Sequence, residues 1–210
     1  MIGLEVDGHV RVLRLDEGEN RFNRTTVDAI HAALDEVQAV AGPVALVTVG
    51  SGKFFSNGLD LDWLMGDGAA DPTFIDDVHR LLHRVLRLDL STVAAVNGHA
   101  FAGGAMLATA HDHRIMREDR GYWCLPEVDL GLPLTQVMFD TVDAHLPRAA
   151  LMEAALTGRR YSGPEALAAG IVQEVAAADE VLERAVERAA SLATKDRRVI
   201  AEHKRLLFGS

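Results

Sequence analysis

The chain has 210 residues, and its 49% hydrophobic and 25% charged residues are typical of a globular protein with one main hydrophobic core. A formal net charge of −10 argues against a general nucleic-acid binder or a protein that binds membrane surfaces by charge. One cysteine excludes an internal disulfide framework, and neither a leader-like N-terminus nor a membrane-length apolar run is evident, so we expect a cytoplasmic protein.

The first fifty residues predict a β-hairpin followed by a βαβ unit. Asp7-Gly8 lies between apolar runs at 2–6 and 10–15, which is a strong hairpin signal. A helix is expected after the cap candidates Asn23 and Thr25, because apolar residues then recur at helical spacing: Val27, Ile30, Leu34 and Val37. Gly42-Pro43 ends that helix, and residues 44–49 read as a buried strand.

A glycine-rich segment, GSGKFFSNGLDLDWL at 50–64, follows this strand. The spacing of its glycines fits neither a phosphate-binding P-loop nor the dinucleotide fingerprint. We therefore interpret it as a turn into a short helix, with backbone amides available near Gly58, Leu59 and Asp60. A polar link at 66–73 and an amphipathic helix carrying Val78 and Leu82 should come next.

The stretch at 93–116, VAAVNGHAFAGGAMLATAHDHRIM, combines a buried strand, a glycine turn and the start of an apolar helix. The first amides of a helix have no intrahelical acceptor and lie at its positive end. Because Gly103 and Gly104 lack a Cβ, a substrate atom could approach these amides closely. The segment is a candidate for half of an oxyanion hole, although a tight packing turn would have the same sequence.

The second half of the chain should contain short strands at 113–116 and 122–125 and then helices. Pro126 and Pro133 bracket EVDLGL, which predicts a loop or turn rather than an uninterrupted helix. Helical segments are expected near 134–145, 148–156, 163–169, 179–194 and 196–207. This order favours an α/β core at 1–133 and a helical C-terminal region at 134–210.

The chain resembles the crotonase family of enoyl-CoA hydratases and isomerases in five segments: FFSNGLDL (54–61), VAAVNGHAFAGGAM (93–106), HDHRIM (111–116), LPEVDLGL (125–132) and LTGRRYSGPEALAAGIV (156–172). The resemblance implies a spiral of ββα units with a helical C-terminal oligomerisation region. It also implies an acyl-CoA substrate whose thioester oxygen is held by the backbone N–H groups of Leu59 and Gly103.

Hydratases of this family use two glutamates, and the resemblance places them at position 106, which is Met106 here, and at Glu127. Methionine cannot transfer a proton, so one carboxylate of the hydration reaction is missing. One carboxylate suffices to move a double bond, and the chain is most similar to Δ3,Δ2-enoyl-CoA isomerases. Glu127 is then the single acid and base. Thr135 stands where dienoyl-CoA isomerases need a further acid, which argues against that reaction.

The resemblance also predicts the surroundings of Glu127. The substrate pocket is expected to contain Met106, Trp123, Leu132 and His99, whose apolar members would raise the pKa of the glutamate. The coenzyme A portion of the substrate is expected at Arg21, Phe22, Lys53, Gly58 and Asp60. No tightly bound cofactor is expected.

Other residues have simpler interpretations. His111 and His113 lack a convincing third metal ligand, so no metal site is expected, and Cys124 reads as a packed strand residue. The family typically forms trimers or pairs of trimers, and we interpret an apolar stripe at 179–194 as a subunit contact: Val181, Leu182, Ala185, Val186, Ala189 and Leu192. Two alternatives remain, hydration with a replacement for the missing glutamate and a non-catalytic acyl-CoA-binding protein.

Overall fold

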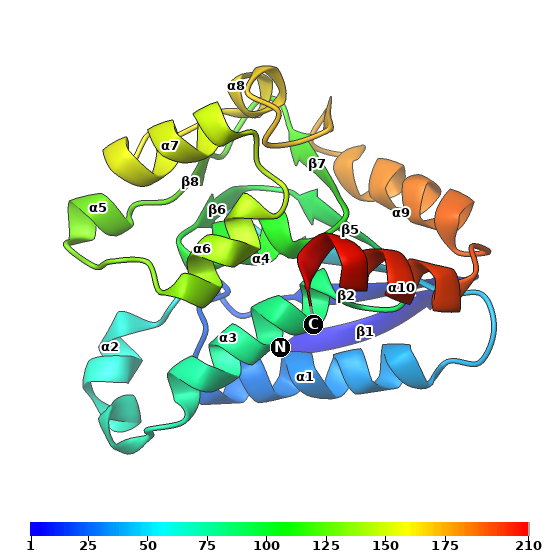
Figure 1. Cartoon of the computed structure of the whole chain (residues 1–210), viewed down its shortest axis with the longest axis horizontal. Helices are drawn as coiled ribbons and strands as arrows, with labels where there is room; N and C mark the ends of the chain where they lie inside the picture. Colours follow the sequence, from blue (N-terminus) through cyan, green and yellow to red (C-terminus); the bar gives the residue numbers. More distant parts are fainter. Residues whose placement is uncertain (210) are drawn as a thin grey trace.

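The computed structural model describes residues 1–209, in which repeating ββα units build two sheets (Figure 1). The larger sheet has the order β1-β2-β3-β5-β7-β9 and the smaller one β4-β6-β8. β1 and β2 pair antiparallel, and the other neighbours pair parallel. The strands are β1 (Ile2–Asp7), β2 (Val10–Leu15), β3 (Ala45–Gly50), β4 (Phe54–Ser56), β5 (Ser91–Val96), β6 (His99–Phe101), β7 (His113–Arg117), β8 (Trp123–Cys124) and β9 (Glu174–Ala176).

Each of the pairs β3–β4, β5–β6 and β7–β8 gives one strand to each sheet before the chain enters a helix. This is the expected spiral of ββα units. The helices are α1 (Arg24–Ala39), α2 (Leu61–Met65), the 3-10 helix η1 (Asp67–Ala70), α3 (Phe74–Leu86), α4 (Gly103–Ala110), α5 (Glu127–Leu130), α6 (Gln136–Asp143), α7 (Arg148–Thr157), α8 (Gly163–Ala168), α9 (Val181–Leu192) and α10 (Arg197–Phe208).

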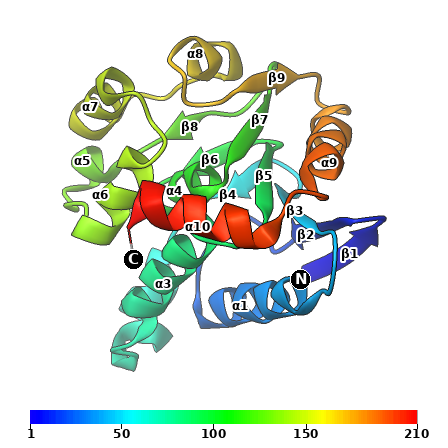
Figure 2. The same cartoon turned by 45° about the vertical axis from the view of Figure 1, so that its right-hand side comes forward.

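The large sheet is covered on both faces. One face packs with α1, α3 and α4 into the main core, and the other packs against α9, as Figure 2 shows beside β5 and β7. Val181, Ala185 and Ala189 of α9 are buried against this sheet. The interpretation of the α9 stripe as a subunit contact was therefore wrong, because its apolar side is used within the chain.

The hairpin, α1 and the buried strands β3 and β5 lie where the sequence predicts them. Asn23 caps α1, since its Oδ1 accepts a hydrogen bond from the Thr26 N–H at 3.0 Å. The prediction of a plain link at 66–73 was wrong, because this segment contains η1. Between Pro126 and Pro133 the chain forms only the single-turn helix α5, so the prediction that no uninterrupted helix spans this segment is confirmed.

The C-terminal region also contains a strand, because β9 pairs with β7 in the large sheet. The division of the chain near residue 133 stays a prediction. Of the helices in residues 1–209, none is long and apolar enough to cross a membrane.

A buried ion pair holds the last helix on the body of the chain. Lys204 of α10 is 5% exposed, and its Nζ lies 2.8 Å from Oδ1 of Asp112 and donates to the Leu90 carbonyl at 3.0 Å. The other oxygen of Asp112 accepts from the Thr92 N–H at 2.9 Å. The carboxylate therefore links the C-terminal helix to β5.

Candidate active site

A cavity of about 620 Å³ opens where α2, α3, α4, α5 and α6 come together, toward the left of Figure 1. Its walls are largely apolar, with a few polar side chains, which is the usual character of a small-molecule site. The lining residues that matter below are Arg21, Asn57, Leu59, Leu61, Asp62, Leu64, Ile75, Val78, Leu82, Gly103, Met106, Glu127, Leu130, Leu132, Thr135 and Met138.

Glu127 lines this cavity from the first residue of α5. Its Oε2 atom is buried and has no hydrogen-bond partner among residues 1–209. Burial raises the pKa of the Glu127 carboxyl from 4.5 to about 7. Near neutral pH this side chain can therefore exist in both protonation states, which suits a group that takes up and returns a proton.

Leu59 presents a free amide to the same region. Its neighbours on both sides pair with one residue, since the Phe22 N–H donates to the Gly58 carbonyl at 2.7 Å and the Asp60 N–H donates to the Phe22 carbonyl at 2.9 Å. In this parallel pairing the Leu59 N–H points away from Phe22. It donates to no acceptor within the described part of the chain.

Gly103 begins α4, so its N–H has no intrahelical acceptor. The preceding residue, Ala102, has a φ of +49°, an uncommon conformation for a residue with a Cβ and one often found at functional sites. Gly58, also at positive φ, packs directly against this turn, because a Cβ on Gly58 would lie 2.8 Å from the Gly103 nitrogen. The segments that carry the Leu59 and Gly103 amides are therefore in contact.

The predicted pocket residues divide into two groups. Met106 and Leu132 line the cavity with Glu127. Trp123 and His99 lie outside it, so their assignment to the substrate pocket was wrong.

The reasons for these two corrections are visible in the packing. Trp123 is fully buried behind α4, where its Nε1–H donates to the Ala105 carbonyl and to Thr109 Oγ1, both at 3.2 Å. His99 stacks in an aromatic group on the small sheet, with ring centroids 5.3 Å from Phe54, 5.0 Å from Phe101 and 5.7 Å from Tyr122.

The residues predicted to bind coenzyme A are also dispersed. Arg21 lines the cavity, where its guanidinium contacts Asp62 at 3.3 Å and Asp60 at 3.8 Å, and Asp60 caps α2. Lys53 is exposed and lies outside the lining. Phe22 is fully buried, with its ring against Gly103, so the prediction that it contacts the coenzyme was wrong.

The remaining histidine and cysteine candidates are structural. His111 is buried between the Leu107 carbonyl and Thr48 Oγ1, each 2.8 Å from a ring nitrogen. Burial raises the pKa of the Cys124 thiol to about 11, which leaves it a poor nucleophile. Among residues 1–209, no three His, Cys, Asp or Glu side chains are placed to hold a metal ion.

Two polar features of the cavity were not anticipated. Asn57 lines it and donates from its amide nitrogen to Glu19 at 2.8 Å. Thr135 caps α6 and lies 3.0 Å from Nε2 of His79 on α3. No local pattern signals either contact, because the partners are 38 and 56 residues apart.

The family model for enoyl-CoA hydratase/isomerase matches residues 5–207 of this chain. The chain belongs to the enoyl-CoA hydratase/isomerase family. This assignment agrees with the predicted resemblance and with the spiral of ββα units.

Among curated members of the enoyl-CoA hydratase/isomerase family, the chain is 39% identical to enoyl-CoA delta isomerase 3 of Arabidopsis thaliana over 93% of this chain and 86% of that protein. It is 36% identical to the peroxisomal enoyl-CoA delta isomerase 2 of the same plant, over 84% and 77% of the two chains. Similarity also extends to carnitinyl-CoA dehydratase of Salmonella typhi, with 37% identity over 78% of this chain and 62% of that protein.

The solved structures of this family share the fold. The probable enoyl-CoA hydratase EchA3 of Mycobacterium tuberculosis superimposes with a TM-score of 0.91 and 28% identity, covering 98% of this chain and 87% of that one. The chain is therefore a member of the crotonase superfamily in both sequence and fold.

Proposed function

We propose that the protein is an acyl-CoA isomerase that moves a 3-enoyl double bond to the 2-position, with Glu127 as its single acid and base. One observation carries this proposal. The partly buried Glu127 carboxyl, whose Oε2 has no hydrogen-bond partner among residues 1–209 and whose pKa is raised to about 7, lines the same cavity as Leu59 and Gly103, whose N–H groups have no acceptor in that part of the chain.

In the proposed reaction, Glu127 removes a proton from C2 of the 3-enoyl thioester. The electron pair moves toward the carbonyl and leaves negative charge on the thioester oxygen. The N–H groups of Leu59 and Gly103 stabilise that charge, and one preorganised donor of this kind is worth about 3 kcal/mol. Glu127 then returns the proton to C4, and the double bond moves into conjugation with the carbonyl.

Met106 supports isomerisation over hydration. It is fully buried in α4 and lines the cavity without a group that can transfer a proton. The other cavity carboxylate, Asp62, forms an ion pair with Arg21. Addition of water to a double bond needs one group that activates the water and another that protonates the substrate carbon. Without a second carboxyl, Glu127 would have to perform both roles.

Water addition or removal is the second candidate, and similarity to carnitinyl-CoA dehydratase favours it. To test the two candidates, the protein is incubated with a panel of 3-enoyl-CoA and 2-enoyl-CoA thioesters. The isomerised and hydrated products are then separated and quantified. We expect conjugated 2-enoyl-CoA as the main product and its loss in Glu127→Gln. Predominant 3-hydroxyacyl-CoA would favour the second candidate, and binding without any product would favour a non-catalytic acyl-CoA-binding protein.

For the coenzyme, we propose that Arg21, Gly58 and Asp60 lie beside the thioester end, with Lys53 at the surface. The proposed isomerisation transfers one proton within the substrate and needs no bound cofactor. Titration with desulfo-coenzyme A, monitored by the thermal unfolding midpoint, tests the coenzyme site. We expect Lys53→Ala and Arg21→Ala to weaken this stabilisation.

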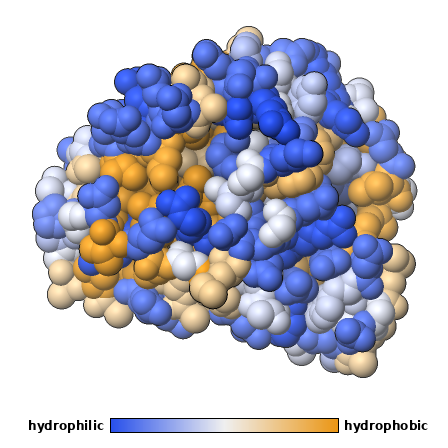
Figure 3. Space-filling view, turned by 180° about the vertical axis from the view of Figure 1, so that it is seen from behind, coloured by the Kyte–Doolittle hydropathy of each residue, from blue (hydrophilic) through white to orange (hydrophobic). Residues whose placement is uncertain are grey.

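A homotrimer or a dimer of trimers is proposed as the assembly. Large apolar side chains are exposed on α5 and α7. Separately, the face opposite to that of Figure 1 carries a broad hydrophobic area bordered by hydrophilic residues (Figure 3). Light scattering on the protein as it elutes from a size-exclusion column gives the mass of the assembly.

The proposed location is the cytoplasm. Imaging of a tagged chain tests this location against the peroxisome.

A further inference from the structure

The cavity wall formed by α2 is held in place by contacts with neighbouring segments, because α2 itself is not buried. Leu61 and Leu64 of α2 line the cavity, and Ile75 and Val78 of α3 continue the same wall. None of the five residues of α2, all in the described part of the chain, is buried. The position of this helix therefore has to be set by what surrounds it.

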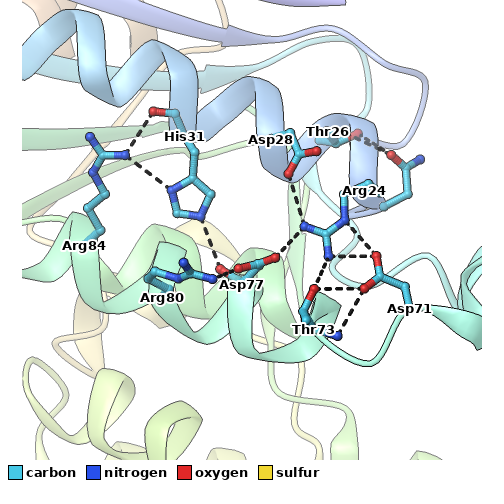
Figure 4. A network of polar contacts seen from close by, with 10 residues as sticks. Arg24, Thr26, Asp28, His31, Asp71, Thr73, Asp77, Arg80 and Arg84 are labelled. Atoms are coloured by element: carbon cyan, nitrogen blue, oxygen red, sulfur yellow. Dashed lines mark hydrogen bonds and ion pairs between the residues drawn. The ribbon is translucent and has the colours of Figure 1, made fainter.

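Arg24, the first residue of α1, joins the loop behind this wall to the body of the chain (Figure 4). Its guanidinium donates to Asp71 at 2.8 and 2.9 Å and to Thr73 Oγ1 at 3.2 Å. It also forms ion pairs with Asp77 and, at 3.2 Å, with Asp28. A cation at a helix N-terminus is opposed by the helix dipole, and these carboxylates offset that effect.

The same guanidinium reaches α2 through two aromatic rings. It lies over Phe74, 5.5 Å from the ring centroid, and Phe74 is fully buried. Phe74 meets the edge of Trp63 in α2 at a centroid distance of 4.7 Å. Trp63 in turn packs on Gly68 of η1, where a Cβ would lie 2.5 Å from its ring. Contact is thus continuous from α1 to the cavity wall.

We propose that Arg24 is a positioning residue that fixes the α2 wall and thereby sets the affinity of the cavity for long acyl chains. This inference rests on the proposed function, because it takes the cavity as the acyl site. A short acyl group ends close to Glu127 and the two amides. A long one has to extend along the apolar lining, and it loses contacts when the wall is displaced.

Arg84 provides a matched control. It joins the other end of α3 to α1 through Asp35, Gln38 and the His31 carbonyl, the last at 3.0 Å. Its side chain is 21% exposed, against 27% for Arg24. Unlike Arg24, Arg84 has no stacked aromatic ring that leads to α2 in the described part of the chain, so its loss should loosen the same pair of helices without displacing α2.

The experiment measures the affinity of the full chain for butanoyl-CoA and decanoyl-CoA by calorimetry, in the wild type, Arg24→Met and Arg84→Met. These saturated thioesters cannot isomerise, so the readout does not depend on turnover. We expect Arg24→Met to weaken decanoyl-CoA about tenfold while butanoyl-CoA changes less than about twofold. Arg84→Met should leave both affinities within about twofold of the wild type.

Three results would overturn the inference alone: equal losses for both ligands in Arg24→Met, no loss for either, or the same length-dependent loss in Arg84→Met. A wild type that binds neither thioester would overturn the proposed function and this inference with it. Thermal unfolding of both variants accompanies the titrations. Comparable midpoints in the two variants show that any chain-length effect is specific to the wall.

Discussion

Met106 of α4 and Glu127 of α5 line the same cavity from two helices, and of the two only Glu127 can transfer a proton. Met106 is fully buried, while Glu127 has one buried oxygen that has no hydrogen-bond partner within residues 1–209. The proton chemistry of the proposed reaction is thus concentrated on one carboxyl. Changing either residue should change the reaction in a defined direction.

A second carboxylate at position 106 should introduce hydration. In Met106→Glu we expect the ratio of 3-hydroxyacyl-CoA to isomerised product to rise at least about tenfold, since general acid–base assistance contributes about 10² or more in rate. The two carboxyls would share one cavity, so like-charge repulsion should raise the pKa of one of them. Product analysis at several pH values measures both effects.

The control is Met106→Leu, which keeps the volume and apolar character of the side chain. It should retain isomerisation and show no gain in hydration. Failure of Met106→Glu to hydrate any 2-enoyl-CoA, in a folded protein that still isomerises, would show that the missing carboxylate does not decide between the two reactions.

Gly58 should be intolerant of a side chain for a reason separate from backbone strain. In Gly58→Ala the new Cβ would lie 2.8 Å from the Gly103 nitrogen and 2.9 Å from the Phe101 carbonyl oxygen. Displacing one oxyanion donor lowers kcat by about 10² to 10³. Steady-state kinetics on a 3-enoyl-CoA, with thermal unfolding measured in parallel, gives the comparison.

Gly52 separates the two effects, because it also has positive φ but a Cβ there would meet nothing within 4 Å. Both substitutions place alanine in a left-handed conformation, which costs about 1 to 2 kcal/mol. Gly52→Ala should therefore lose stability while kcat stays unchanged. Equal kcat in the two variants would exclude the Gly103 amide from catalysis.

The raised pKa of Glu127 links activity to stability. Below pH 7 the free enzyme should lose kcat/KM about tenfold per pH unit, because the base becomes protonated. In the folded protein the pKa is about 7, against 4.5 ordinarily, so between these values the folded state binds more protons than the unfolded one. The contribution of the Glu127 carboxyl to the free energy of unfolding is therefore fully present below pH 4.5 and is lost as the pH rises to 7.

Glu127→Gln removes this ionisation. At pH 8 the variant should be more stable than the wild type by about 3 kcal/mol, since each pKa unit corresponds to about 1.4 kcal/mol. At pH 4 the two proteins should unfold at nearly the same urea concentration. A variant that is less stable at pH 8 would indicate that the carboxylate is solvated or paired in the folded protein.

The buried pair between Lys204 and Asp112 should contribute strongly to the attachment of α10. Lys204→Met leaves the Asp112 carboxylate without its cation. Breaking a fully buried pair costs about 3 to 5 kcal/mol, and because the Asp112 side chain is 21% exposed we expect a loss of about 2 to 3 kcal/mol here. Urea unfolding measures the loss. On the same helix, Arg205 pairs with Glu202 at the surface, so Arg205→Met should have little effect. Similar losses of stability in Lys204→Met and Arg205→Met would show that burial of the Lys204 ion pair does not increase its contribution.

Much of the fold could be predicted from local patterns. The Asp7-Gly8 turn, the periodicity of α1 and the apolar run of β5 are strong signals that depend on neighbouring residues alone. The three-residue strands β4, β6 and β9 were missed, because such short segments show no periodicity. Their pairing depends on partners far away in the chain.

The site was harder to predict than the fold, since burial and direction are tertiary properties. The sequence resemblance predicted Glu127 and the amides of Leu59 and Gly103 as site groups, and these three residues line one cavity of the structure. It could not show that Trp123 faces the back of α4. Likewise, an apolar stripe on α9 has the same pattern whether it packs on the chain's own sheet or on another subunit.

The most direct measurement of the central claim is a single turnover of a 3-enoyl-CoA that carries deuterium at C2. If Glu127 alone removes and returns the proton, a fraction of the deuterium should be recovered at C4 of the 2-enoyl product, and Glu127→Gln should lose the reaction by about 10² or more. Product that carries hydrogen from solvent alone at C4, or a Glu127→Gln variant that reacts at the wild-type rate, would contradict the account.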